Sequence, residues 1–198
     1  MIELSDEILA DIHSKVDCFY ELIKGKYDAA LYQEEVYNEL VKRFSRPSSV
    51  ARADIEKALR WKYGKKEQER LAPGHINVLE DIASGWNDFT ARELTSPEES
   101  HSYWMLTLNR KSAYISVSYI IHLVYYRSHS LPIIDRFNWA ATKYFLSLGG
   151  VELRNSPTKY SDILLVKEFI DLLLSEDSSK AFRDVDKYLM MFGKHVAP

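Results

Sequence analysis

Apolar residues recur at spacings of three and four along nearly the whole chain, a period typical of helices that bury one face. The first run begins after Ser5, a helix-capping residue type, and ends at Gly25. The expected helices cover residues 8–23, 31–44, about 49–63, 75–83, 97–108, 113–126, 135–148, 161–175 and 178–192. The pattern predicts a compact all-α fold.

Two of these segments carry the clearest signals. Ser96-Pro97-Glu98-Glu99 combines a cap, a proline in the first turn and acids near the positive end of the helix dipole. The run 113–126 is apolar nearly all round, which predicts the central buried helix. Its β-branched residues also suit a strand, but the run is longer than a typical buried strand, so a helix is favoured.

Composition limits the kinds of partner. The 198 residues carry a net charge of −3, so binding to nucleic acid needs a local basic patch. Cys18 is the single cysteine, which excludes disulfides and cysteine-rich zinc sites within one chain. The sequence has no metalloprotease or phosphate-loop motif. We expect no metal, no cofactor and no nucleotide.

The chain shows no feature of a membrane or secreted protein. No apolar run approaches the roughly 20 residues that span a bilayer. The acidic start, Met1-Ile-Glu-Leu-Ser-Asp-Glu7, lacks the basic-then-apolar order of a signal peptide. We therefore expect a soluble cytoplasmic protein that makes no contact with a membrane.

The segment with the clearest potential for chemistry is Leu131-Pro-Ile-Ile-Asp135. Pro132 forces the preceding residue into an extended conformation, and Ile133 and Ile134 anchor the segment to the core. Asp135 then falls where the first residue of a helix needs a cap. A carboxylate at that place either accepts backbone N–H bonds, worth about 1 kcal/mol, or takes part in a reaction.

Leu106–Trp139 resembles the core of the helix-hairpin-helix (HhH-GPD) DNA glycosylase superfamily. In that superfamily a helical hairpin with a glycine-containing turn leads into an apolar helix. A short Pro-Ile/Val-Asp segment follows, and its acid opens another helix. Ser116–Leu123 matches the apolar helix, Leu131–Asp135 matches the acid segment, and Ala181–Leu189 is similar to the closing helix of small relatives.

The resemblance implies a single helical domain over 1–198. Its DNA-glycosylase-like core covers about 96–150, and the flanking helices from 1–95 and 151–198 complete the fold. Two helical lobes with a cleft between them would be the corresponding architecture.

The resemblance also implies an activity. Such enzymes extrude a modified base from double-stranded DNA and hydrolyse its N-glycosidic bond, as in DNA repair. The transition state resembles an oxocarbenium ion, which a nearby carboxylate stabilises, and Asp135 holds the matching position. The implied DNA contacts are Asn109, Arg110, Lys111, Ser112 and Ser116, and the implied pocket aromatics are Trp104, Tyr125, Tyr126 and Trp139.

The sequence departs from that pattern in two places. The stretch Asn109–Tyr114 contains no glycine, which makes a close backbone approach to phosphate harder. Ser116 stands where strand-cleaving members carry a nucleophilic lysine, and serine forms no Schiff base. A monofunctional hydrolase needs only the acid. The alternative is a catalytically degenerate relative that binds DNA or a protein partner, or that has no role with nucleic acid.

Three further features have more than one interpretation. Arg60–Lys66 interleaves basic and aromatic residues, which suits either a DNA contact or a helix end with Trp61 packed inward. His122 lies on the most apolar helix and is more typical of a core histidine than of a ligand. Asp184 and Asp186 lie near Arg183 and Lys187, which predicts a solvated face with local ion pairs.

Overall fold

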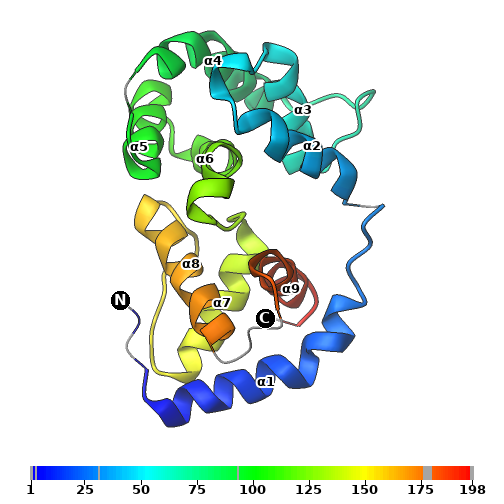
Figure 1. The fold of residues 1–198 in the computed structure, drawn as a ribbon, viewed down its shortest axis with the longest axis vertical. Coiled ribbons are helices and arrows are strands. Elements are labelled where there is room, and N and C mark those ends of the chain that lie inside the picture. Colours follow the sequence, from blue (N-terminus) through cyan, green and yellow to red (C-terminus); the bar gives the residue numbers. More distant parts are fainter. Residues whose placement is uncertain (1, 3, 31, 93, 176–179, 197–198) are drawn as a thin grey trace. The chain divides into compact units, whose positions relative to one another are not determined.

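Nine α-helices and two short 3-10 helices account for most of the described chain in a computed structural model, and no strand occurs among the described residues (Figure 1). The described residues are 2, 4–30, 32–92, 94–175 and 180–196. The helices are α1 (Asp6–Lys24), α2 (Glu34–Phe44), η1 (Pro47–Ser49), α3 (Arg52–Lys62), α4 (Pro73–Ala91), α5 (Pro97–Leu108), η2 (Lys111–Ala113), α6 (Tyr114–His129), α7 (Arg136–Leu148), α8 (Tyr160–Ser175) and α9 (Phe182–His195). The predicted all-α fold class is confirmed. None of the helices in the described part is both long and apolar enough to cross a bilayer.

The chain divides into two compact units. Unit 1 consists of Met1–Asp28 and Leu131–Pro198, and unit 2 consists of Ala29–Ser130. In unit 1 the first helix of the chain, α1, packs against α7 and α9, which come from the far end of the sequence (Figure 1). Unit 2 is continuous in sequence and contains α2 to α6.

Unit 1 is built around the pair α7 and α9. Gly193 is buried in α9, and a Cβ atom at that position would lie 1.8 Å from the carbonyl oxygen of Phe137 in α7. The two helix backbones therefore touch where any larger residue would hold them apart. Phe145 and Phe192 pack 4.6 Å apart between ring centres, and both are fully buried.

Unit 2 is built around α6. Its residues Val117, Tyr119, Ile120 and Ile121 are fully buried, which confirms the predicted central helix and excludes a strand there. The surrounding helices contribute large rings to the same core. Trp104 of α5 is fully buried and stacks on Trp86 of α4 at 6.1 Å.

Most helix boundaries follow the local signals. Ser5 accepts a hydrogen bond from the Ile8 N–H, and Ser96 forms the reciprocal capping box with Glu99. Gly25 and Gly149 follow the last residues of α1 and α7. These sequence predictions are confirmed.

Several boundaries differ from the prediction. α6 continues to His129 and α9 to His195, beyond the expected ends at 126 and 192. The helix expected over 75–83 is longer in the structure, where α4 continues through Gly85 to Ala91. The missing Cβ of Gly85 leaves room for the Trp104 ring. Ser48 and Ser49 do not open α3. They belong to η1, and α3 begins at Arg52 with its start fixed by Asp54, which accepts the Ala51 N–H at 2.9 Å. The expected starts at Leu31 and Ser178 lie outside the described residues.

Candidate functional site

The acid of the Leu131–Asp135 segment caps α7. Leu131 to Ile134 are buried, and Asp135 has an extended backbone with φ −151° and ψ −176°. Its Oδ1 accepts the N–H groups of Phe137 at 2.8 Å and of Asn138 at 3.1 Å. The Asn138 Oδ1 in turn accepts the Asp135 N–H at 2.8 Å. The Asp135 side chain is thus held in one orientation while the residue stays partly exposed.

A second, buried carboxylate supports the same segment from α9. Asp186 is 2% exposed, and its Oδ2 accepts the Ile133 N–H at 3.3 Å and the Arg183 Nη1–H at 2.7 Å. The amide of Asn138 donates to the Ile133 carbonyl and to the Asp186 Oδ1. Asp186 therefore fixes the extended segment that precedes Asp135.

The pKa of the Asp186 carboxyl group depends on the groups around it. Burial raises its pKa above the ordinary value, and the nearby charge of Asp135 acts in the same direction. The Arg183 guanidinium and the Ile133 N–H oppose this rise. The solvated face predicted for this part of α9 is wrong at Asp186, because the 3.6-residue period turns it toward α7 beside buried Val185.

The α5–α6 connection forms a tight turn between two helices. Asn109 ends α5 in the left-handed region, with φ 45° and ψ 37°, and its N–H bonds to the Met105 carbonyl. Arg110 is extended, and η2 leads directly into α6. Asparagine adopts this conformation more readily than other non-glycine residues, so it replaces the glycine that the turn lacks.

The hairpin side chains differ in how accessible they are. Asn109, Lys111 and Ser112 are exposed. Arg110 forms an ion pair with Asp81 of α4 at 2.7 Å, with both side chains still partly exposed. Ser116 is 3% exposed, and its hydroxyl is 2.6 Å from the Tyr63 hydroxyl. Its side chain is therefore held inside unit 2 rather than on the hairpin surface, where a phosphate contact was expected.

The predicted pocket aromatics lie largely in the two cores. Trp104 is fully buried, and Trp139 is 2% exposed and donates its Nε1–H to the Arg154 carbonyl at 2.9 Å. Tyr125 is half-buried, with its hydroxyl 2.7 Å from that of Ser100. Tyr126 is half-buried beside the His122 ring, at 5.1 Å between centres. Of these four aromatics, the two tyrosines keep surface that a ligand could reach.

The predicted site residues are divided between the units. Asp135 and Trp139 belong to unit 1, whereas the hairpin residues and the other aromatics belong to unit 2. Within unit 1 the carboxylate has a fixed orientation, and within unit 2 the exposed Asn109, Lys111 and Ser112 lie on one turn.

The basic and aromatic stretch at the end of α3 packs inward. Trp61 stacks on Tyr119 with an interplanar angle of 11° and donates its Nε1–H to the Tyr32 carbonyl. Tyr63 stacks on His75 at 3.6 Å between ring centres. These ring contacts agree with the interpretation of the stretch as a helix end with Trp61 packed inward.

The histidine of α6 agrees with its interpretation as a core histidine. His122 is 1% exposed, and its Nε2 is 3.0 Å from the Tyr37 hydroxyl. It is therefore a core histidine with a polar partner.

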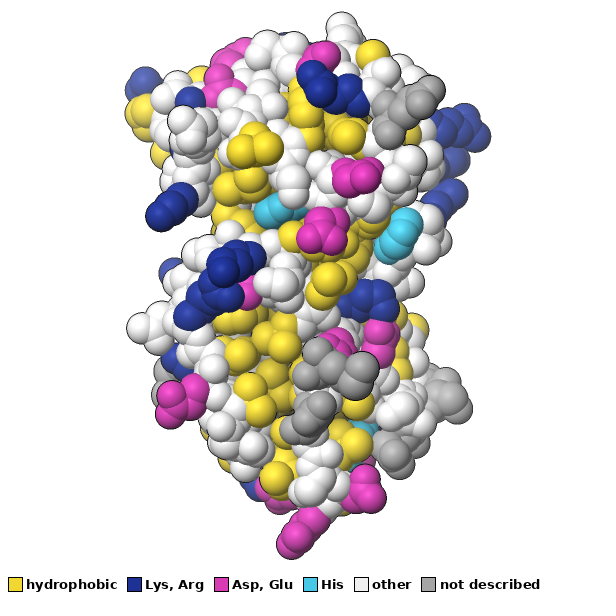
Figure 2. Space-filling view, turned by 90° about the vertical axis from the view of Figure 1, so that its left-hand side faces the viewer, with side chains coloured by type: hydrophobic (Ala, Val, Ile, Leu, Met, Phe, Trp, Pro, Cys, Tyr) yellow, Lys and Arg dark blue, Asp and Glu magenta, His cyan; other side chains and the backbone are white. Residues whose placement is uncertain are grey.

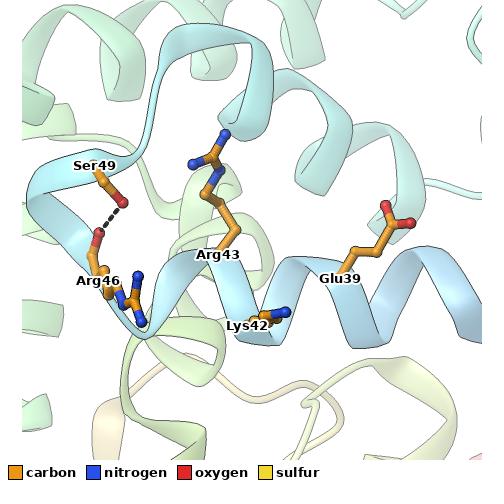
Figure 3. A pocket seen from close by; sticks show the side chains of 5 residues that line it. All are labelled: Glu39, Lys42, Arg43, Arg46 and Ser49. Atoms are coloured by element: carbon orange, nitrogen blue, oxygen red, sulfur yellow. Dashed lines mark hydrogen bonds between the residues drawn. The ribbon is translucent and has the colours of Figure 1, made fainter.

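Sequence reasoning missed a basic depression of about 260 Å³ at the end of α2, lined by Glu39, Lys42, Arg43, Arg46 and Ser49 (Figure 3). The available signal was Lys42-Arg43-Phe-Ser-Arg46, three cations within five residues. A second depression, of about 580 Å³, lies beside Trp61 and mixes cations with Asp54, Glu56 and Glu67.

No protein-family model, curated protein or solved structure matches the chain. Over the described residues, no three His, Cys, Asp or Glu side chains are grouped so as to hold a metal ion. The candidate functional features are therefore Asp135 with its supporting network in unit 1 and, separately, the hairpin turn and the basic depression in unit 2.

Proposed function

We propose that this protein binds double-stranded DNA through the α5–α6 hairpin and hydrolyses the N-glycosidic bond of a modified base with Asp135 as the catalytic carboxylate. The observation that carries the proposal is the order of the elements. A helical hairpin leads into a buried helix, then into an extended apolar segment, and then into an aspartate that opens the next helix. This is the order of the helix-hairpin-helix glycosylase motif.

The hairpin supplies groups suited to a phosphate. Asn109, Lys111 and Ser112 present an amide, an ammonium and a hydroxyl at exposed positions, interrupted only by Arg110. Contacts of this kind fix the register of a protein on DNA without reading its sequence. Because Ser116 replaces the lysine nucleophile, the proposed chemistry is hydrolysis without strand cleavage.

The position of Asp135 suits the hydrolytic step. Its carboxylate is oriented by two backbone N–H groups and the residue is partly exposed, so the group can act on a substrate without rearranging. In the reaction the C1′–N bond breaks, a water oxygen bonds to C1′, and the departing base takes a proton. The carboxylate stabilises the positive charge that develops on the sugar and accepts the proton of the attacking water.

The test is a panel of duplexes, each with one modified base, scored for abasic sites by cleavage in hot alkali. Asp135→Asn keeps a capping oxygen and removes the charge, so it should abolish release while the helix stays capped. Asp184→Asn, which removes a carboxylate from the first turn of α9, should keep full activity. Release that survives in Asp135→Asn would contradict the proposed mechanism.

A second candidate is a non-catalytic DNA-binding relative. The observation in its favour is that capping by itself accounts for the Asp135 carboxylate, since Oδ1 already accepts two N–H groups. This candidate predicts duplex binding that weakens steeply with salt, together with no base release from any duplex in the panel. A protein that fails to bind duplex DNA at all would rule out both candidates.

A further inference from the structure

The depression at the end of α2 is lined by three cations that lie within five residues of the chain. Lys42 and Arg43 lie in the last turn of α2, and Arg46 follows where the chain turns into η1. All three residues line the depression. Figure 3 shows them with Ser49, whose hydroxyl donates to the Arg46 carbonyl at 2.9 Å.

The acidic neighbours of these cations are already engaged. Glu39, the one acid lining the depression, forms an ion pair with Lys57 at 2.6 Å, and Lys57 lowers its pKa. Arg43 is 3.2 Å from the Asp54 Oδ1, while the other oxygen of Asp54 accepts the Ala51 N–H. In the described part of the chain, neither Lys42 nor Arg46 forms an ion pair.

A structural role explains only part of this arrangement. Cations in the last turn of a helix interact favourably with its dipole, which accounts for Lys42 and Arg43. That effect falls off within the turn, and Arg46 lies beyond the end of α2. The like charges that line the depression repel one another, with only Arg43 paired with an acid of the described chain, and a bound anion would offset this repulsion.

On the face that Figure 2 presents, the basic side chains are dispersed. The chain has an excess of acidic residues, and Figure 2 shows Lys and Arg side chains interspersed with Asp and Glu on the face it presents, without one large basic surface. A DNA-binding function therefore depends on small basic sites. Arginine suits phosphate because its planar fork donates two parallel hydrogen bonds.

We infer that Lys42, Arg43 and Arg46 form a second phosphate-binding site, which holds the backbone of the same DNA duplex that the hairpin contacts. The inference rests on the proposed function. The site contacts no base, so it contributes affinity and not sequence preference. Each cation that neutralises a phosphate releases counterions and steepens the salt dependence of binding by about one unit of log-log slope.

The test measures binding of a fluorescent duplex of about 20 base pairs by anisotropy, between about 50 and 200 mM salt. Lys42→Gln and Arg46→Gln should each weaken binding about threefold, and the double variant about tenfold. The double variant should also lower the salt slope by about two units. The matched control is Arg92→Gln, an exposed cation of the same unit that pairs with Asp88, and it should bind like wild type.

The outcomes separate the two proposals. If wild type binds the duplex and the double variant keeps the slope of Arg92→Gln, this site is overturned while the proposed function stands. If wild type does not bind, the proposed function and this site fail together. Poly-glutamate of equal charge, used as competitor, should displace the duplex poorly, and displacement as strong as by unlabelled duplex would overturn the assignment to phosphate. Unchanged thermal unfolding in each variant shows that the fold is intact.

Discussion

The two units bury ionisable groups of opposite kinds. Unit 1 encloses the carboxylates Asp162 and Asp186, each held by an arginine and by at least one backbone N–H group. Unit 2 encloses the histidines His101 and His122 among aromatic rings. Unit 1 thus uses buried charge to fix extended segments to helices, whereas the buried histidines of unit 2 lie among rings, and His122 has the Tyr37 hydroxyl as its polar partner.

The units also differ in how their helices meet. In unit 1 the Gly193 position brings α9 against the backbone of α7. In unit 2 the corresponding glycine, Gly85 in α4, faces the Trp104 side chain, and a Cβ atom added there would lie 3.1 Å from the nearest ring atom. An added methyl group would meet backbone at Gly193, so the two helices would have to move apart, whereas at Gly85 it would meet a ring, which would have to shift by a few tenths of an ångström.

The largest expected effect comes from removing the buried carboxylate of unit 1. Asp186→Ala leaves Arg183 charged inside the unit and the Ile133 N–H without its acceptor, so it should cost about 4 kcal/mol of unfolding free energy. Asp184→Ala, in the same helix and partly exposed, should cost less than about 0.5 kcal/mol. Denaturant titration gives both values, and equal losses would show that burial of charge does not distinguish unit 1.

The next effect tests the contact between helix backbones. Gly193→Ala places a methyl group onto the Phe137 carbonyl, so α9 and α7 must separate at a cost of about 3 kcal/mol. Gly85→Ala should be nearly neutral, because the gain in helix propensity offsets the shift of Trp104. Gly74→Ala, which meets nothing within 4 Å, is the reference. Similar thermal stability for all three variants would contradict the claim that helices meet more closely at Gly193 than at Gly85.

The pH dependence should have opposite signs in the two units. Burial lowers the pKa of His101 from 6.5 to about 4, so between these values the unfolded chain binds a proton that folded unit 2 does not. Stability from His101 is complete above pH 6.5 and is lost as the pH falls toward about 4. The stability of wild type relative to His101→Gln should fall by about 2 kcal/mol across this range.

Asp186 provides the opposite sign. Its pKa is raised, so the folded state binds the proton first, and stability increases as the pH falls through the folded pKa toward the ordinary value. Wild type should therefore gain stability relative to Asp186→Asn on acidification. Hydrogen exchange reports on each unit separately, and parallel pH profiles for the two units would contradict the comparison.

Sequence signals located most of the helices because the decisive interactions are local. Ser5, Ser96 and Asp135 each cap a helix through residues two or three positions away, and such spacing can be read directly. The end of α4 was missed because it depends on a partner far along the chain. Glycine ends many helices, but Gly85 continues this one, since Trp104 of α5 packs against it.

The candidate site likewise combines features that depend on local sequence with features that depend on distant partners. The capping role of Asp135 follows from its place in the sequence, and an asparagine at position 109 could have been recognised as a left-handed helix end. The burial of Asp186 could not be foreseen, because it depends on Ile133 and Asn138 from another helix and its approach. Ser116 likewise acquires its partner, Tyr63, only through folding.

The smallest expected effect separates the two roles of Asp135. Asparagine and serine both keep a capping oxygen, so Asp135→Asn and Asp135→Ser should change the unfolding free energy by only a few tenths of a kcal/mol. Asp135→Ala removes the acceptor for the Phe137 and Asn138 N–H groups and should cost about 1 kcal/mol.

Base release should follow a different order from stability. If the carboxylate takes part in the reaction, all three variants lose activity, although only alanine weakens the cap. If the residue only caps α7, the asparagine and serine variants keep whatever activity the wild type has. A ranking of activity that follows the ranking of stability would therefore assign Asp135 to the architecture of unit 1, together with Asp162 and Asp186, and remove it from the chemistry.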